Sequence, residues 1–147
     1  MRDFYGERLV SAVIFGSIGR NTPNYDSDVD ILIIAENLPC GRMERIREFG
    51  HIESKMEPEF DSLKKSGINS YLSPVIKSVE EASAGSPLFL DMTEDSIILY
   101  DRDMFFKNLM DALKKRLGEL GAKRVFRANA FFWDLKPDYK PKENIII

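Results

Sequence analysis

The chain has 147 residues and a mass of 16.9 kDa, the length of one globular domain. Hydrophobic residues make up 44% and charged residues 31%, which excludes a disordered or fibrous protein. The net charge of −3 is divided into −7 for residues 1–100 and +4 for residues 101–147. The short apolar runs and the single cysteine, Cys40, predict a cytoplasmic protein without a membrane partner.

The first third of the sequence predicts two strands joined by a turn and a loop. Residues 2–8 favour a short helical lead-in, and the β-branched run Leu9–Phe15 predicts a strand. Gly16–Arg20 is expected to turn tightly into a short helix, and Asn21–Ser27 to form a loop. The uninterrupted apolar run in Val29–Ala35 predicts a central strand that is buried on both faces.

A helical period and then a strand follow. Apolar residues recur every three or four positions at Met43, Ile46, Phe49, Ile52, Met56, Phe60 and Leu63. Pro58 is expected to break or kink this stretch, so that two helices are predicted with the second opening near Pro58, and Gly67 is expected to end the second. Asn69–Lys77 predicts a strand in which Pro74 indicates an edge or a bulge.

The last third predicts two more helices and two more strands. Pro87 favours the start of a short helix, and Ser96–Tyr100 predicts a strand. Asp101 is placed to cap a long helix that ends at Gly121. The apolar face of that helix is expected to comprise Phe105, Leu109, Leu113, Leu117 and Leu120. A further strand is expected within Arg124–Leu135, followed by a loose tail.

These elements predict an α+β (mixed α/β) fold, a small mixed sheet flanked by helices. We expect a single domain over residues 1–147, with a core of about residues 1–85 and an extension of about residues 86–147 packed on it. A basic surplus lies between Lys114 and Arg127, where it forms either a phosphate-attracting patch or a solvated helix end. The absence of glutamine favours a thermophilic source.

The chemistry-bearing residues lie in Val13–Ile34. Gly16 permits a sharp turn, and Ser17 adds a hydroxyl where free N–H groups attract an anion. Asp28 and Asp30 are two residues apart at the start of a strand, so both carboxylates lie on one face. A divalent cation would relieve their repulsion, whereas the alternative is an acidic pair that only ends a loop.

Taken together, the Gly-Ser turn, ten intervening residues and an Asp-x-Asp strand resemble the nucleotidyltransferase superfamily that includes DNA polymerase beta and kanamycin nucleotidyltransferase. The short chain is similar to the minimal members of that superfamily. The resemblance implies a polymerase beta-like fold and a reaction in which a hydroxyl attacks the α-phosphorus of a nucleoside triphosphate. It implies that Gly16, Ser17 and Arg20 bind the nucleotide, and that Asp28 and Asp30 are catalytic and bind Mg²⁺ or Mn²⁺.

One feature departs from the family pattern. The family places a third carboxylate on the strand after the long helix, but here the matching segment contains no Asp or Glu, and Ser73 or Pro74 stands where the acid is expected. The acids that could substitute for it are Asp91, Glu94, Asp95 and Asp134.

A few other residues have two readings. His51 and Cys40 have no neighbours in sequence that indicate a site. Phe131, Phe132 and Trp133 could stack a base, although strand spacing favours packing in a core.

Three functions therefore stand as hypotheses. The first is an Mg²⁺-dependent nucleotidyltransferase that moves an NMP, plausibly AMP, from an NTP to the hydroxyl of an unknown acceptor. The second is a catalytically degenerate nucleotide- or partner-binding protein, an antitoxin-like member of a two-protein module with a helical partner protein or a homo-oligomer. The third is a nucleic-acid-binding module that uses the basic C-terminal third.

Overall fold

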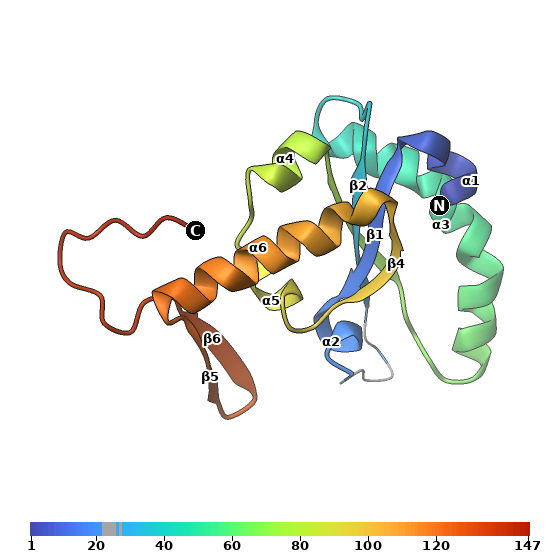
Figure 1. Ribbon diagram of the computed structural model, residues 1–147. Helices are drawn as coiled ribbons and strands as arrows, with labels where there is room; N and C mark the ends of the chain where they lie inside the picture. The colour runs from blue at the N-terminus through green and yellow to red at the C-terminus, as the bar shows by residue number, and fades with distance from the viewer. Residues whose placement is uncertain (22–25, 27) are drawn as a thin grey trace.

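The computed structural model describes residues 1–21, 26 and 28–147. Its centre is a four-stranded mixed sheet in the order β3-β2-β1-β4, in which β1 pairs antiparallel with β2 and β4, and β2 pairs parallel with β3 (Figure 1). The strands are β1 (Leu9–Phe15), β2 (Val29–Ala35), β3 (Leu72–Lys77) and β4 (Ile97–Asp101). The predicted α+β class, the central position of β2 and the edge position of β3 are confirmed.

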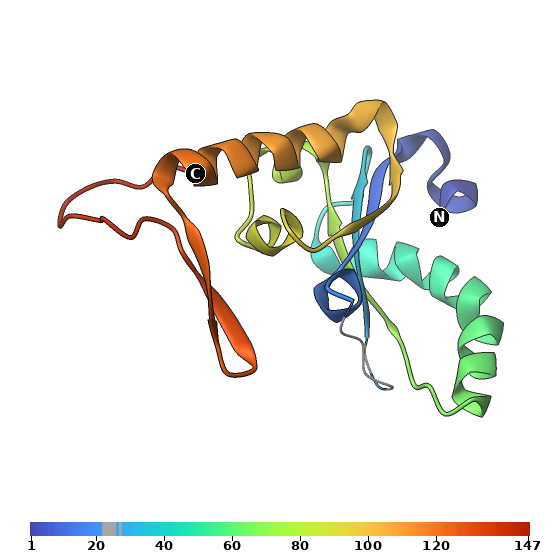
Figure 2. The ribbon, with the colours of Figure 1, turned by 60° about the horizontal axis from the view of Figure 1, so that its bottom comes forward.

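Helices cover both faces of this sheet, with α6 and α5 on one side and α3 on the other (Figure 2). The helices are α1 (Arg2–Tyr5), η1 (Gly6–Arg8), α2 (Gly16–Gly19), α3 (Arg42–Lys65), α4 (Val79–Ser83), α5 (Leu88–Met92), η2 (Arg102–Met104) and α6 (Phe105–Leu120). A separate two-stranded sheet follows, formed by β5 (Lys123–Arg127) and β6 (Ala130–Asp134). None of the helices in the described part of the chain is long and apolar enough to cross a bilayer.

The core consists of two layers that share β2. Leu32 and Ile34 point to the layer that contains Phe89 and Phe106, whereas Ile31 and Ile33 belong to the layer closed by Phe49 and Ile52. Consecutive side chains of β2 point alternately into the two layers. Its uninterrupted apolar run therefore buries hydrophobic side chains on both faces of the sheet.

The predicted break at Pro58 is wrong, because α3 is one helix that runs through Pro58 and changes direction along its course (Figure 1). A proline inside a helix removes one N–H donor and favours a bend, but it does not have to end the helix. Phe49 and Ile52 anchor the first half against the sheet. The helix ends where expected, with Gly67 at φ +82°.

Several other elements differ from the prediction. The strands expected from Asn69 and from Ser96 begin at Leu72 and Ile97. Helix α4 was missed, although Ser78 and Glu81 form a capping box that the sequence could have signalled. The buried residues of α6 are Phe106, Met110 and Leu117. Of these, only Leu117 belongs to the face that was predicted from the sequence.

Asp101 caps the long helix as predicted. Its Oδ1 accepts hydrogen bonds from the Phe106 N–H at 2.8 Å and the Ser11 hydroxyl at 2.7 Å, and its Oδ2 accepts one from the Lys107 N–H at 2.9 Å. Asp101 therefore ties the start of α6 to strand β1.

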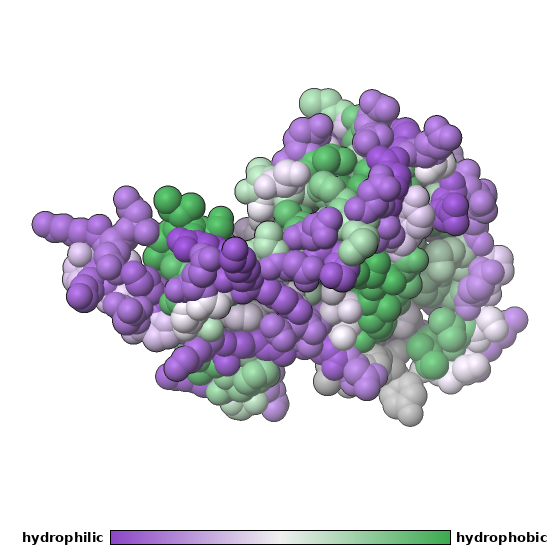
Figure 3. All heavy atoms as spheres, viewed as in Figure 1, coloured by the Kyte–Doolittle hydropathy of each residue, from purple (hydrophilic) through white to green (hydrophobic). Residues whose placement is uncertain are grey.

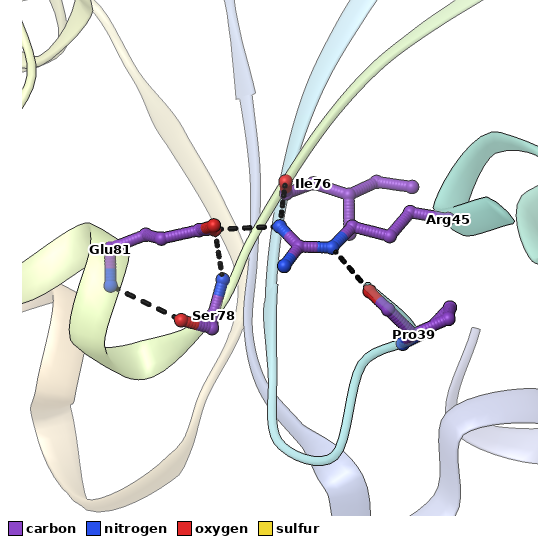
Figure 4. Close-up of polar contacts among 5 residues, drawn as sticks. All are labelled: Pro39, Arg45, Ile76, Ser78 and Glu81. Atoms are coloured by element: carbon purple, nitrogen blue, oxygen red, sulfur yellow. Dashed lines mark hydrogen bonds and ion pairs between the residues drawn. The ribbon is translucent and has the colours of Figure 1, made fainter. Parts of the chain in front are cut away.

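Arg45 joins the beginning of α3 to the end of β3 and to α4 (Figure 4). Its guanidinium donates to the carbonyls of Pro39 at 3.0 Å and Ile76 at 3.4 Å, and to Glu81 Oε2 at 2.6 Å. The Arg45 side chain is only 15% exposed, and its hydrogen bond lowers the pKa of Glu81 below the ordinary value of 4.5. Glu81 also closes the Ser78 capping box, so one cluster fixes three segments.

We expect Arg45→Met to lower the free energy of unfolding by about 1–3 kcal/mol, because it leaves partly buried acceptors without donors. The matched change Arg47→Met removes an exposed Arg47–Glu44 pair and should cost less than about 0.5 kcal/mol. Urea denaturation at neutral pH measures both. The lowered pKa of Glu81 means that its contribution is present above pH 4.5 and is lost as the pH falls through the lowered value. Equal losses in the two variants would contradict this assignment.

Candidate functional site

The predicted site residues lie at one end of the main sheet. In the antiparallel pairing of β1 and β2, Phe15 stands opposite Asp30, and in the parallel pairing of β2 and β3, Asp30 stands opposite Ser73. Chain reversal after β1 therefore places Gly16 and helix α2 beside the first residues of β2.

Gly16 lies directly against the Asp30 carboxylate. It has φ +72°, and a Cβ built on it would lie 2.2 Å from Asp30 Oδ2. Both the positive φ and the lack of space exclude any other residue without a local shift. The backbone of the turn therefore packs directly on the Asp30 carboxylate. Ser17 follows in the first turn of α2.

The surroundings of Asp30 both raise and lower its pKa, and the net shift is upward. Desolvation is the largest cause that raises its pKa above the ordinary value, and the nearby charge of Asp28 adds to the increase. A hydrogen bond from the Ser73 side chain and the charge of Arg20 lower it in part. Asp28 is exposed, so the carboxylate pair is accessible from solvent. The charges of Asp28 and Arg20 both act on Asp30, so the three side chains lie close enough to interact electrostatically.

The donor atoms suit a hard divalent cation. Asp28 and Asp30 supply carboxylate oxygens and Ser73 a hydroxyl, and Mg²⁺ commonly takes one or two carboxylates with substrate phosphates completing its shell. The Gly16 backbone packs closely against Asp30, which leaves no space for a side chain between the turn and the carboxylate. Within the residues described, no group of three His, Cys, Asp or Glu side chains comes together.

Two of the four acids considered as substitutes for the third carboxylate form hydrogen bonds or ion pairs with other residues. Asp91 accepts a hydrogen bond from Trp133 Nε1 at 2.9 Å, and Asp95 pairs with Arg124 at 2.6 Å. Asp134 stands opposite Lys123 in the hairpin. Glu94 joins no acidic group of three in the described part of the chain. Ser73, rather than Pro74, is the residue opposite Asp30.

The remaining sequence candidates lie away from this chemistry. His51 stacks on Phe4 with ring centroids 5.5 Å apart, and Cys40 is an exposed thiol before α3. Asp26 accepts a hydrogen bond from Asn69 at 3.3 Å. The loop expected over Asn21–Ser27 lies mostly outside the described residues, and so does Ser27.

The contact between the C-terminal hairpin and this end of the molecule was not predicted from the sequence. The Arg20 guanidinium lies over the Phe131 ring at 5.5 Å, and a Cβ on Gly19 would lie 2.8 Å from the Asp95 carbonyl oxygen. Strand β5 was missed because its turn has no Gly: Ala128 takes the positive φ of 51° that Gly or Asn usually supplies. Strand β6 falls within the range predicted, but its aromatic residues belong to neither core layer.

Comparison with known proteins shows the family of the chain. A family model described as a nucleotidyltransferase domain matches residues 1–84. A Methanocaldococcus jannaschii protein (MJ1305), provisionally named a protein adenylyltransferase, is 35% identical over 112 residues, which are 75% of this chain and 71% of that protein. A chain from a variant of the toxin–antitoxin pair MntA–HpeT has a similar fold, with a TM-score of 0.50 and 16% identity over 82% of this chain and 86% of that one. A chain from a toxin–antitoxin structure with AMP-PNP matches with a TM-score of 0.49 and 17% identity over 82% and 86% of the two chains.

Proposed function

The chain belongs to the nucleotidyltransferase family, and on that basis we propose that it transfers a nucleoside monophosphate, AMP in the first instance, from a nucleoside triphosphate to a hydroxyl group of a protein. The observation that carries the proposal is the contact between the Gly16 backbone and the Asp30 carboxylate. It puts the backbone of the Gly16–Ser17 turn beside the Asp28 and Asp30 carboxylates, whose charges favour a cation.

The residues divide the work between phosphate and metal. The Gly16–Ser17 turn binds the triphosphate, and Arg20 adds positive charge on the same side. Asp28 and Asp30 hold Mg²⁺ or Mn²⁺, which neutralises the charge that develops on the phosphate oxygens when it is bound. The chain thereby orients the α-phosphorus and lowers the cost of bringing an acceptor oxygen to it.

The reaction exchanges one phosphorus–oxygen bond for another. The acceptor oxygen forms a bond to the α-phosphorus, the bond between the α- and β-phosphates breaks, and pyrophosphate leaves. The acceptor proton passes to solvent or to a base on the acceptor, because Ser73 stands where the family has its third carboxylate.

An exposed apolar strand close to the Gly16–Ser17 turn supports a protein as the acceptor. Ile97, Ile98 and Leu99 of β4 are 44%, 43% and 53% exposed, and Figure 3 shows a hydrophobic patch over this strand. Ile97 pairs with Ile14, two residues before Gly16. An exposed apolar edge strand is typical of an interaction surface, and a polypeptide docked there would lie next to the Gly16–Ser17 turn.

The proposed activity is tested with ATP that is labelled on either the α- or the γ-phosphate. The assay contains Mg²⁺ and the proteins of a cell extract as acceptors. Label from the α position should remain on a denatured acceptor band, and label from the γ position should not. The variant Asp30→Asn should lose label transfer. Its matched control is Asp134→Asn, which removes a hairpin carboxylate and should leave the activity unchanged. Transfer of both labels, or of neither, would rule out nucleotidyl transfer to protein.

The acceptor surface makes a separate prediction. Ile98→Lys should reduce label transfer to the acceptor at least tenfold, because it puts a charge on an apolar contact, and it should leave ATP affinity unchanged. Met43→Lys changes a residue that is 72% exposed at the start of α3, and serves as the matched control. A gel assay of label transfer with calorimetric titration of ATP separates the two effects. Equal transfer by both variants would remove β4 as the acceptor surface.

A second function is favoured by one specific observation. Ser73 opposite Asp30 leaves two carboxylates where the family has three. A protein of that kind can bind a nucleotide without turning it over and act as the nucleotide-binding, antitoxin-like member of a two-protein module. It would bind ATP in the experiment above but transfer no label.

A further inference from the structure

The hairpin β5–β6 has two chemically different faces. Cross-strand pairing puts Arg124 opposite Trp133 and Phe126 opposite Phe131, and these four side chains share one face because residues alternate along a strand. The opposite face carries the pair Val125 and Phe132. Figures 1 and 2 show the hairpin standing apart from the main sheet.

The first of these faces is fastened to the body of the protein. Arg124 pairs with Asp95 at 2.6 Å, and Trp133 Nε1 donates to Asp91 at 2.9 Å. The Arg124 pair is largely shielded, since its side chains are 16% and 20% exposed. Asp95 in turn contacts α2, because its carbonyl oxygen would lie 2.8 Å from a Cβ on Gly19.

Arg20 completes the connection to the phosphate-binding turn. Its guanidinium lies 5.5 Å from the centre of the Phe131 ring, within cation–π range, and its charge also acts on Asp30. Arg20 follows Gly16 by four residues, about 6 Å along a helix. A nucleotide with phosphates at the Gly16–Ser17 turn therefore has the hairpin within the length of its sugar and base.

The Phe126 ring, which lies near the turn of the hairpin, is largely exposed on this face. Phe126 is 65% exposed, although it lies 5.7 Å from the Phe131 ring and 5.0 Å from the Arg124 guanidinium. Arg124 also lies over Phe131, at 4.5 Å, so the three groups form a supported aromatic surface. Flat aromatic and guanidinium groups of this kind stack nucleobases irrespective of their sequence.

We propose that Phe126, supported by Phe131 and Arg124, is the platform that stacks the base of the nucleotide substrate. The proposal rests on the proposed function, because it takes the triphosphate to lie at the Gly16–Ser17 turn. It assigns binding of the nucleobase to the C-terminal hairpin, beyond residues 1–84 that the family model covers. A purine, with its larger ring, should bind more tightly than a pyrimidine.

The test compares ATP with inorganic tripolyphosphate, both with Mg²⁺, by calorimetry and by the fluorescence of Trp133, the only tryptophan of the chain. Phe126→Ala should weaken ATP binding about tenfold and leave tripolyphosphate binding unchanged. ATP, but not tripolyphosphate, should alter the Trp133 emission. The matched control is Phe132→Ala, on the opposite face and 47% exposed, which should change neither affinity.

Each other result has a defined meaning. Equal ATP affinities of Phe126→Ala and Phe132→Ala, with normal tripolyphosphate binding, would overturn the platform and leave the proposed function standing. If the unmodified protein binds neither compound, the proposed function fails and the platform fails with it. If Phe126→Ala weakens binding of an oligoadenylate but not of ATP, the hairpin is an RNA surface and the proposal is wrong.

Discussion

Replacement of Asp30 by Asn is expected to change activity and stability in opposite directions. Label transfer should fall about 10²–10³-fold, because the variant loses one of the two carboxylates that hold the cation at the phosphates. The metal-free variant should nevertheless unfold at a higher temperature than the unmodified protein. The raised pKa of Asp30, caused mainly by desolvation, means that its charged form costs folding free energy.

The pH dependence gives the sign of this effect. Asp30 has a higher pKa in the folded than in the unfolded chain, so its contribution to stability is most favourable in acid and is lost as the pH rises through the folded value. The advantage of Asp30→Asn should therefore be full at neutral pH and disappear as the pH falls. Thermal unfolding at neutral and acid pH, with and without Mg²⁺, measures it, and Mg²⁺ should stabilise only the unmodified protein. A variant that is less stable than its parent at neutral pH without Mg²⁺ would contradict the cost assigned to the partly desolvated Asp30 charge.

Replacement of Ser73 by Asp is expected to restore a complete set of carboxylates. Neighbouring strands lie about 4.8 Å apart, so a carboxylate opposite Asp30 can share an ion with it. Ser73→Asp should bind Mg²⁺ more tightly and transfer label about tenfold faster. Without Mg²⁺ it should be less stable, because a third negative charge joins Asp28 and Asp30.

The neutral variant Ser73→Asn provides the control for size and hydrogen bonding. It should gain neither Mg²⁺ affinity nor activity, because its amide is neutral and can still donate a hydrogen bond to Asp30, as the Ser73 hydroxyl now does. Calorimetry with Mg²⁺ and the α-label assay compare the two variants. If Ser73→Asp is no more active than Ser73→Asn, the missing acid does not limit this protein, and the second, nucleotide-binding function gains support.

The sequence could predict those parts of the fold that local chemistry determines. The apolar runs of β1 and β2, the edge position indicated by Pro74, and the Asp101 cap all depend on residues close together in the chain. Pro58 misled the prediction because tertiary packing of α3 outweighs the loss of one N–H donor. Helix α4 was predictable from its capping box but is too short to show a helical period.

The site was predictable in its first part and not in its second. The Gly-Ser turn and the Asp-x-Asp strand lie close together in the sequence, and the antiparallel pairing of β1 and β2 brings Gly16 and Asp30 together. The contact of Arg20 with Phe131 joins residues more than a hundred positions apart, and it depends on the Asp95–Arg124 pair. The periodicity of the sequence does not predict contacts between residues so far apart. The hairpin turn at Ala128 also lacks the glycine that usually indicates a hairpin.

The measurement that tests the account most directly is calorimetric titration of ATP, with and without Mg²⁺, into the unmodified protein and the Asp28→Asn/Asp30→Asn double variant. We predict tight binding only when the protein has both carboxylates and Mg²⁺ is present. The variant should bind weakly, and with the same affinity whether Mg²⁺ is added or not. ATP affinity that is unchanged in the variant, or that does not depend on Mg²⁺ in the unmodified protein, would contradict a nucleotide site at Gly16, Asp28 and Asp30.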